Sequence, residues 1–254
     1  MIKESEVFIN GLKINYKIAG EGPAILILHG WGGSSDSWTN TQEILAKKNY
    51  KIIVPDLPGF GKSSLPPFAF NLNEFCKILE KFISELGLDR FYLLGHSFGG
   101  AVAVKYALKY PQKIKGLILV GAACFRRKNI KKRISFLAAK MFKIFSFLPF
   151  YPLMRRVFYK IFFKKSDYPY FEGVMKESYL KIIKEDLSEG LERIKVPTLI
   201  IWGQKDKIKK LKEGVAINKK IKDSVLKIIP GTGHSPHLEK PELLTREILG
   251  FLTK

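Results

Sequence analysis

The strongest constraint on the fold of this chain is a regular alternation of short apolar runs with segments of helical periodicity. A continuous apolar strand has to be buried on both faces, and a parallel sheet covered by helices on each side achieves that burial. Right-handed crossovers then order such units into an open, doubly wound sheet. The apolar runs span residues 24–30, 51–59, 91–97, 116–122, 198–206 and 225–234. The chain is therefore predicted to adopt an α/β fold with a doubly wound, mostly parallel sheet.

The N-terminal segment departs from this pattern and alternates apolar with polar residues. In EVFINGLKINYKIAG (6–20) the alternation runs on both sides of the pair Asn10-Gly11. An Asn-Gly pair between two alternating runs is the strongest short-range signal for a two-residue hairpin turn. We therefore expect an antiparallel hairpin to form one edge of the sheet.

The alternation also stops between residues 122 and 187. This segment holds 16 Lys and Arg against 5 Asp and Glu, so over half of the net charge of +21 lies in about a quarter of the chain. It also holds 15 of the 32 aromatic residues. Compact domains seldom contain structureless loops of this length. We predict a helical cap at 122–187, inserted into a single core formed by residues 1–121 and 188–254.

Net charge and composition limit the classes of partner that the protein could have. A net charge of +21 fits nucleic acid, an anionic membrane or an acidic substrate, and equally fits lysines spread over solvated faces. We adopt the last interpretation for the chain as a whole and expect no nucleic-acid partner. The N-terminus shows no apolar segment before a cleavage site, and Cys76 and Cys124 lie outside any metal-ligand spacing. These features predict a cytoplasmic protein with free thiols and no metal site.

One hydroxyl lies between two glycines at the end of an apolar run, in the segment LLGHSFGG (93–100). The spacing G-x-S-x-G is typical of a nucleophile elbow, a strand-to-helix turn so sharp that its serine is strained and exposed. Side chains at Gly95 and Gly99 would collide with the strand or the helix. The alternative is an inert serine in a glycine-rich turn. The other motifs of the chain favour Ser97 as a nucleophile.

The ends of two later apolar runs carry the groups that a serine nucleophile needs. The working residues of an open α/β sheet lie just beyond the carboxyl ends of its strands. Asp206 ends one of these runs and His234 ends the next. The order Ser, acid, His along the chain is the order expected of a triad on such a sheet. His234 would be the base for Ser97, and a buried Asp206 would orient its imidazole.

Each of these assignments has a competitor in the sequence. Asp206 could also be a turn aspartate without a catalytic role. Two other aspartates are weaker candidates for the acid of the triad. Asp223 precedes a strand instead of following one, and Asp56 lies in a segment that we interpret as structural. His237 enters the segment leading to Pro241, so His234 is preferred as the base. Structural roles are also expected for the histidines His29 and His96, which would hold their own loops by hydrogen bonds, and for the core aromatics Trp38 and Trp202.

Five motifs in register resemble the α/β-hydrolase superfamily over nearly the whole chain except the predicted cap. They are HGWGGSSDSW (29–38), PDLPGFGKSS (55–64), GHSFGG (95–100), PTLIIWGQKD (197–206) and GTGHSPHLEKPE (231–242). Within the superfamily the chain resembles cap-bearing serine esterases and carbon–carbon bond hydrolases of the meta-cleavage-product type. The resemblance implies an α/β-hydrolase core with an inserted helical cap.

The resemblance also implies an oxyanion hole built from two backbone N–H groups, one directly after the nucleophile and one in the loop after the third strand. In this chain these are the N–H groups of Phe98 and Trp31. Gly30 and Gly32 are expected to let the backbone of that loop approach the substrate. The helix that begins at Phe98 directs its positive dipole end at the same site.

Together these features predict a serine hydrolase that cleaves carboxylic esters of apolar acyl or aromatic groups through an acyl-enzyme intermediate, without a cofactor. A carbon–carbon bond hydrolase is the first alternative, with Arg126, Arg155 or Arg156 as candidate partners of a dienoate carboxylate. A non-catalytic receptor or binding module is the second. The cap aromatics are expected to line the pocket. The basic residues of the cap also fit a peripheral contact with an anionic membrane.

Overall fold

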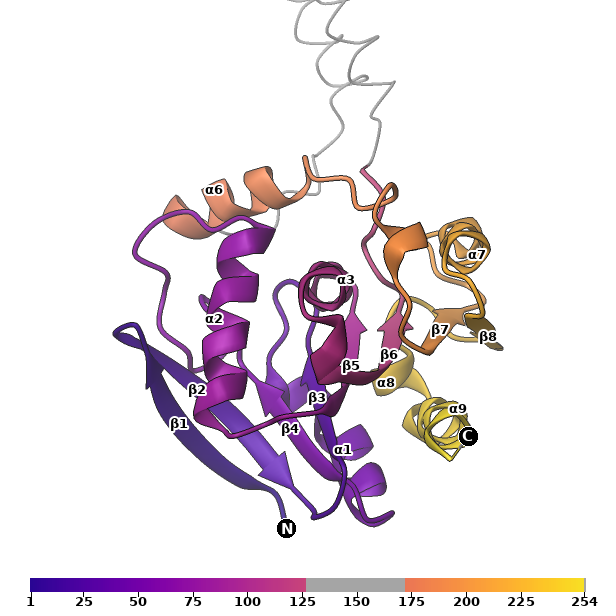
Figure 1. The fold of residues 1–254 in the computed structure, drawn as a ribbon, viewed down its shortest axis with the longest axis horizontal. Helices are drawn as coiled ribbons and strands as arrows, with labels where there is room; N and C mark the ends of the chain where they lie inside the picture. Colours follow the sequence, from indigo (N-terminus) through magenta and orange to yellow (C-terminus); the bar gives the residue numbers. More distant parts are fainter. Residues whose placement is uncertain (127–171, 254) are drawn as a thin grey trace, which may run out of the picture. The chain divides into compact units, whose positions relative to one another are not determined.

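The computed structural model describes residues 1–126 and 172–253, in which one eight-stranded sheet carries helices on both faces (Figure 1). The strands are β1 (Lys3–Ile9), β2 (Leu12–Ala19), β3 (Ala24–Leu28), β4 (Lys51–Pro55), β5 (Phe91–His96), β6 (Ile114–Val120), β7 (Thr198–Gly203) and β8 (Val225–Ile229). Their order in the sheet is β1-β2-β4-β3-β5-β6-β7-β8. Every pair from β4 to β8 is parallel. The predicted fold class is therefore confirmed.

The predicted hairpin forms the first edge of the sheet. β1 and β2 pair antiparallel, with Ile9 opposite Leu12, and β2 also runs antiparallel to β4. Asn10 and Gly11 have φ values of 52° and 78°. Two consecutive positive φ values are what a type I′ hairpin turn requires, and asparagine and glycine adopt them at least cost.

Helices cover the two faces of the sheet in the way that the apolar runs require. The α-helices are α1 (Thr39–Ala46), α2 (Leu72–Glu85), α3 (Phe98–Lys109), α6 (Gly173–Ile182), α7 (Leu211–Lys220), α8 (Pro236–Glu239) and α9 (Pro241–Leu252), and the short 3-10 helices are η1 (Ser35–Trp38), η2 (Pro111–Lys113) and η4 (Leu191–Arg193). Figure 1 shows α2 and α3 on one face and α1 and α9 on the other. The helices α1 and α9 close a fully buried cluster in which Ile25 and Ile27 of β3 take part.

The start of α2 illustrates how local chemistry fixes a boundary. Asn71 precedes the helix, and its side-chain oxygen accepts hydrogen bonds from the N–H groups of Asn73 and Glu74. The carboxylate of Glu74 in turn accepts from the N–H of Asn71, at 2.7 Å. This reciprocal capping box satisfies N–H groups that a helix start otherwise leaves unpaired. Seven apolar side chains of α2 are then buried against the sheet side of the helix.

Met1–Arg126 and Gly173–Lys254 belong to one compact unit. Most of the predicted cap, residues 122–187, lies outside the described residues, so its helical character stays a prediction. The described C-terminal part of that segment includes α6, which packs against the core. The hydroxyl of Ser178 accepts a hydrogen bond from the N–H of Phe70 at 2.9 Å, and Lys181 donates to the carbonyl of Ala69 at 2.6 Å.

Two glycines allow α3 to approach the sheet more closely than any side chain would permit. A Cβ atom at Gly99 would lie 2.3 Å from the carbonyl oxygen of Leu28 and 2.5 Å from that of His29. A Cβ atom at Gly95 would lie 2.4 Å from the carbonyl oxygen of Gly99. All of these neighbours are backbone atoms, which cannot turn away. The first turn of α3 is therefore pressed directly onto the ends of β3 and β5.

We expect the Gly99→Ala variant to lose about 1–3 kcal/mol of unfolding free energy, because its methyl group would overpack a rigid backbone contact. The measurement is the urea unfolding midpoint and slope. Gly250→Ala is the matched control, since this exposed position of α9 has no atom within 4 Å of the added Cβ. It should gain about 0.5–1 kcal/mol from helix propensity. Equal effects of the two substitutions would contradict the close approach of α3.

Candidate active site

Ser97 occupies the sharp turn between β5 and α3. Its backbone lies at φ 51° and ψ −112°, a left-handed conformation that costs of order 1–3 kcal/mol in a residue with a side chain. Two hydrogen bonds hold it there: its N–H donates to the carbonyl of Val120 at 3.0 Å, and its own carbonyl accepts from Ala123 at 2.9 Å. The surrounding sheet thus stabilises the strained turn, and the Ser97 side chain remains half-buried at its tip.

The structure brings Ser97, Asp206 and His234 together at the carboxyl ends of β5, β7 and β8. The Nε2 atom of His234 lies 3.0 Å from the Oγ atom of Ser97. The Nδ1 atom of the same ring lies 2.7 Å from the Oδ2 atom of Asp206. All three sequence-predicted side chains therefore form one hydrogen-bonded array, although 137 residues separate the first from the last.

Asp206 is the buried end of this array, with a side chain that is 0% exposed. Its Oδ1 atom accepts hydrogen bonds from the N–H groups of Ile208 and Lys209, both at 2.8 Å. Burial alone would raise the pKa of this carboxyl group, but the hydrogen bonds from His234 and from these N–H groups outweigh burial and lower its pKa. The carboxylate is therefore ionised and fixed, and because it accepts at His234 Nδ1, it leaves Nε2 as the acceptor toward Ser97.

The loop that carries His234 is held on both sides of the histidine. The carboxylate of Glu239 in α8 accepts from the N–H of Gly233 at 2.7 Å and from the N–H of Ser235 at 3.2 Å. Glu239 does not directly follow a strand, so its role was not predictable from the strand-end pattern that indicates Asp206 and His234. The available signal was its position: Glu239 lies five residues after His234, in the short helix α8.

The two expected oxyanion-hole residues flank the serine. Phe98 is the first residue of α3, directly after Ser97. Gly30 lies against the same turn, since a Cβ atom added to it would be 3.4 Å from the Cβ of Ser97. The ring of Trp31 packs edge-on against Phe98 with centroids 5.1 Å apart, and Gly32 adopts a φ of 78°. The roles of Trp31, Phe98, Gly30 and Gly32 in binding an oxyanion stay predictions.

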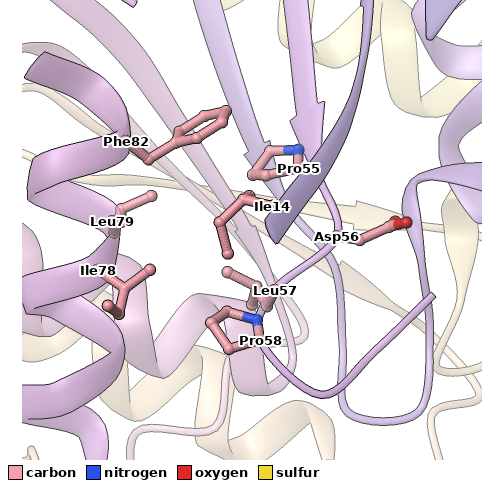
Figure 2. A pocket seen from close by; sticks show the side chains of 8 residues that line it. All are labelled: Ile14, Pro55, Asp56, Leu57, Pro58, Ile78, Leu79 and Phe82. Carbon is pink, nitrogen blue, oxygen red and sulfur yellow. The ribbon is translucent and has the colours of Figure 1, made fainter. Parts of the chain in front are cut away.

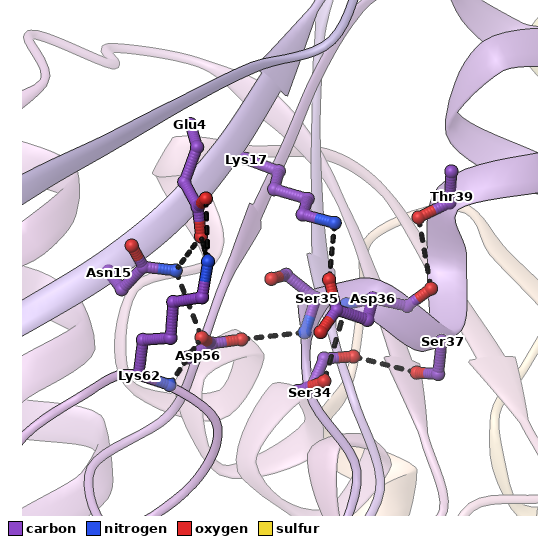
Figure 3. A network of polar contacts seen from close by, with 10 residues as sticks. All are labelled: Glu4, Asn15, Lys17, Ser34, Ser35, Asp36, Ser37, Thr39, Asp56 and Lys62. Carbon is purple, nitrogen blue, oxygen red and sulfur yellow. Dashed lines mark hydrogen bonds and ion pairs between the residues drawn. The ribbon is translucent and has the colours of Figure 1, made fainter.

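A buried carboxylate fixes the loop in which Trp31 lies (Figure 3). Asp56, at the end of β4, accepts from the N–H of Ser35 at 2.6 Å through Oδ1. Its Oδ2 accepts from the side chain of Asn15 at 3.0 Å and from the N–H of Lys62 at 2.9 Å. Glu4 continues the network, because it accepts from both Asn15 and the Lys62 ammonium. The structural interpretation of Asp56 fits this role. Lys62 belongs to the same motif as Asp56, whereas Asn15 and Ser35 come from other segments of the chain.

The remaining histidines surround the array without competing for Ser97. His29 holds its own loop as expected, with Nδ1 2.8 Å from the carbonyl oxygen of Gly30, and its Nε2 accepts from the N–H of Leu57. The prediction for His96 is wrong in its partner, because the ring bonds to the carbonyl of His234 at 2.9 Å instead of to its own loop. His237 is buried and stacks on Trp38 at 4.2 Å, away from the hydroxyl.

Two residues of α6 also reach this region. The ring of Tyr179 lies 5.3 Å from that of Trp31, and the Met175 side chain fills the space against Gly59. Both residues lie within the predicted cap, 122–187, and no motif of the sequence distinguishes either of them. Of the arginines considered for a carboxylate, Arg126 is exposed and its N–H donates to Asp186, whereas Arg155 and Arg156 lie outside the described residues.

An apolar pocket lies elsewhere, between α2 and the segment that follows β4 (Figure 2). Its volume of about 10 Å³ holds no more than one water molecule. Its lining residues are Ile14, Pro55, Asp56, Leu57, Pro58, Ile78, Leu79 and Phe82. None of them belongs to the array, so this pocket is a packing defect of the core and not a substrate site.

Across residues 1–126 and 172–253, no three His, Cys, Asp or Glu side chains gather in a way that would hold a metal ion. Over the same part of the chain, no helix is both long and apolar enough to cross a membrane.

A mostly parallel eight-stranded sheet with a serine, a histidine and an aspartate at its strand ends defines the class of α/β hydrolases. The family model for the alpha/beta hydrolase fold matches residues 23–148 and 125–241, so the chain belongs to this family. It is 34% identical over 240 residues to Lipase 1 of Psychrobacter immobilis, covering 89% of this chain and 74% of the relative.

Two further similarities extend over almost the whole chain. A 2-hydroxy-6-oxo-6-phenylhexa-2,4-dienoate hydrolase of Comamonas testosteroni is 26% identical, with 98% of this chain and 94% of the relative covered. The solved structure of a thermophilic esterase from Thermogutta terrifontis matches with a TM-score of 0.77 at 27% identity, covering 99% of this chain and 98% of that one. The family resemblance drawn from the five motifs is confirmed.

We expect Asp56→Asn to reduce the unfolding free energy by about 2–4 kcal/mol, because the amide must direct its NH₂ group at one of the N–H donors that now face a carboxylate oxygen. Urea unfolding measures the loss. Asp36→Asn is the control in the same network, since Asp36 pairs with Lys17 at the surface and its side chain is 69% exposed. It should change stability by no more than about 0.5 kcal/mol. Similar losses in both variants would show that Asp56 has no special structural role.

The lowered pKa of Asp206 predicts a pH-dependent contribution to stability. The contribution is complete above the pKa of an unfolded aspartate, about 3.9, and is lost as the pH falls through the lower pKa of the folded state. The difference in unfolding free energy between the wild type and Asp206→Asn should therefore shrink between pH 6 and pH 2. Urea unfolding of both proteins over this range tests it, and a difference that stays constant would contradict the lowered pKa.

Proposed function

We propose that the protein is a serine hydrolase that cleaves carboxylic esters of apolar acyl or aromatic groups. The observation that carries this proposal is the array from Ser97 through His234 to Asp206, with hydrogen-bond lengths of 3.0 and 2.7 Å. These lengths are within the range in which a base accepts the proton of a nucleophile and is itself oriented by a third group. Ser97 is the nucleophile, His234 the general base and Asp206 the orienting carboxylate.

In the first half of the reaction, Ser97 Oγ attacks the ester carbonyl while His234 Nε2 accepts the hydroxyl proton. The resulting imidazolium is stabilised by the ionised Asp206, and the new oxyanion would accept hydrogen bonds from the N–H groups of Phe98 and Trp31. When the tetrahedral intermediate collapses, His234 returns the proton to the departing alkoxide oxygen. The alcohol leaves, and the acyl group stays on Ser97.

In the second half, a water molecule replaces the alcohol. His234 accepts a proton from the water as its oxygen attacks the acyl carbon, and the second tetrahedral intermediate releases the carboxylic acid with return of the proton to Ser97 Oγ. The side chains and backbone N–H groups of this chain supply the base, the nucleophile and the donors, so the mechanism uses no cofactor.

The surroundings of Ser97 support an apolar substrate. The half-buried Trp31 is in ring contact with Phe98, Phe60 and Tyr179, at centroid distances of 5.1, 4.9 and 5.3 Å. Aromatic walls of this kind bind acyl chains or rings and exclude water. The names of the bacterial lipase and the thermophilic esterase, to which the chain is similar, support ester cleavage.

The proposal includes the predicted domain organisation. Residues 1–121 and 188–254 would form the catalytic core, and residues 122–187 would form a helical cap that supplies further aromatic residues to the acyl site. The basic surplus of that segment would attract an anionic membrane surface as a peripheral partner. We propose a cytoplasmic location.

A carbon–carbon bond hydrolase is the second candidate, and the similarity to the dienoate hydrolase of Comamonas testosteroni favours it. The same triad serves both reactions. The two substrates differ in that a dienoate carries a carboxylate, which needs a fixed cation near Ser97. Turnover of a 2-hydroxy-6-oxo-dienoate faster than of any p-nitrophenyl ester would select this candidate.

We expect a fluorophosphonate probe to label the wild-type protein at Ser97 and not to label Ser97→Ala. Hydrolysis of short- and long-chain p-nitrophenyl esters should fall on the order of 10⁶-fold in kcat in Ser97→Ala and about 10⁴-fold in Asp206→Asn, because the latter leaves the histidine in the wrong tautomer. Mass spectrometry of the labelled peptide and steady-state kinetics are the measurements. A wild-type protein with neither labelling nor turnover would be a binding module on the same fold.

A further inference from the structure

His96 is the last residue of β5 and directly precedes Ser97, and its side chain is buried. Its Nε2 atom lies 2.9 Å from the carbonyl oxygen of His234, a residue 138 positions away in the chain. The end of β5 therefore carries two functions. It leads into Ser97, the proposed nucleophile, and the His96 side chain contacts the backbone of His234, the proposed base.

The His234 carbonyl determines which nitrogen of the His96 ring carries the proton. A carbonyl oxygen only accepts hydrogen bonds, so Nε2 must carry the proton and donate it. Burial, together with the neighbouring His234, lowers the pKa of His96 to about 3, so the ring is neutral at ordinary pH and Nδ1 keeps its lone pair. A neutral ring at this place also adds no positive charge beside the imidazolium that forms on His234 during the reaction.

The same ring touches the other parts of the site. A Cβ atom at Gly30 would lie only 2.8 Å from His96 Nδ1, so the loop of Trp31 rests on this edge of the ring. On the other side, the ring of His237 lies at 4.6 Å and stacks in turn on Trp38. The ring is therefore packed between these neighbours while its Nε2 faces the His234 carbonyl.

We propose that His96 is a positioning residue, which sets the separation of Ser97 Oγ and His234 Nε2 by donating its Nε2–H to the His234 carbonyl. Asp206 fixes the direction of the His234 ring, and Glu239 holds the N–H groups on either side of it. The bond from His96 ties the backbone of this loop to the strand of the nucleophile. The inference rests on the proposed serine-hydrolase function, because its effect is on proton transfer.

Three substitutions of His96 separate the hydrogen bond from the volume of the ring. His96→Gln places an amide N–H near the position of Nε2, His96→Asn places one about 2 Å short of it, near Nδ1, and His96→Met fills space without a donor. We expect His96→Met and His96→Asn to lower kcat by about 10- to 100-fold, the effect of a small displacement of a catalytic group, with KM changed less than about twofold. His96→Gln should recover kcat to within about threefold of the wild type.

The measurements are kcat and KM for a p-nitrophenyl ester, the rate of fluorophosphonate labelling, and the thermal midpoint of each variant. His237→Phe is the matched control, since it removes an imidazole from the same cluster and retains the stack on Trp38. It should keep kcat within a few-fold of the wild type. If His96→Met does not fold, the comparison of the Gln and Asn variants still isolates the position of the donor.

Wild-type kcat in both His96→Met and His96→Asn would overturn the inference, as would a Gln variant no better than the Asn variant. A parallel loss in kcat and thermal midpoint that Gln does not restore would show a packing role only. These results leave the proposed function intact, whereas a wild-type protein without labelling or turnover removes the proposed function itself.

Discussion

Parallel pairing of β5, β6, β7 and β8 is the constraint on which the rest of the structure depends. Parallel strands end on the same edge of a sheet, so the turns after them become neighbours whatever the chain length between them. The register pairs His96 with Val120 and Gly203 with Ile229. A slip of one residue in either pairing would move every side chain to the opposite face and separate the groups of the site.

Two carboxylates are buried at the ends of strands of the sheet. They accept the same number of hydrogen bonds but differ in the kind of donor. Asp56, after β4, and Asp206, after β7, each accept three hydrogen bonds. The partners of Asp56 are all amide N–H groups, so its charge serves to hold loops together. One partner of Asp206 is an imidazole, which can gain a proton. In the proposed mechanism this difference lets Asp206 stabilise the imidazolium that forms on its partner.

The sequence predicted those features that depend on residues close together in the chain. Alternation about Asn10-Gly11 predicted the hairpin, continuous apolar runs predicted the parallel strands, and the glycines around Ser97 predicted the sharp turn. The convergence of Ser97, Asp206 and His234 was also predictable, because strand ends in a parallel sheet meet by topology. What the sequence did not show are the contacts between loops.

The bond from His96 to the His234 carbonyl and the contact of Tyr179 with Trp31 belong to this second group. The first depends on how the loop after β8 lies against the end of β5, and the second on where α6 packs against the core. No local pattern encodes either placement. The network of Glu4, Asn15 and Asp56 is similar. Asn15 lies in an alternating strand and is buried only because the neighbouring loop covers it, and Glu4 reaches that loop from an exposed position.

The four histidines of the chain show how environment, and not residue type, assigns roles. Burial lowers the pKa of His29, of His96 to about 3 and of His237 to about 2, so all three remain neutral and serve as rigid donors, acceptors or packing surfaces. His234 differs because it is partly exposed and its Nδ1 faces an ionised carboxylate. An imidazolium is therefore disfavoured at His29, His96 and His237. In the proposed mechanism the proton of Ser97 goes to His234, whose Nε2 lies within hydrogen-bonding reach of the hydroxyl.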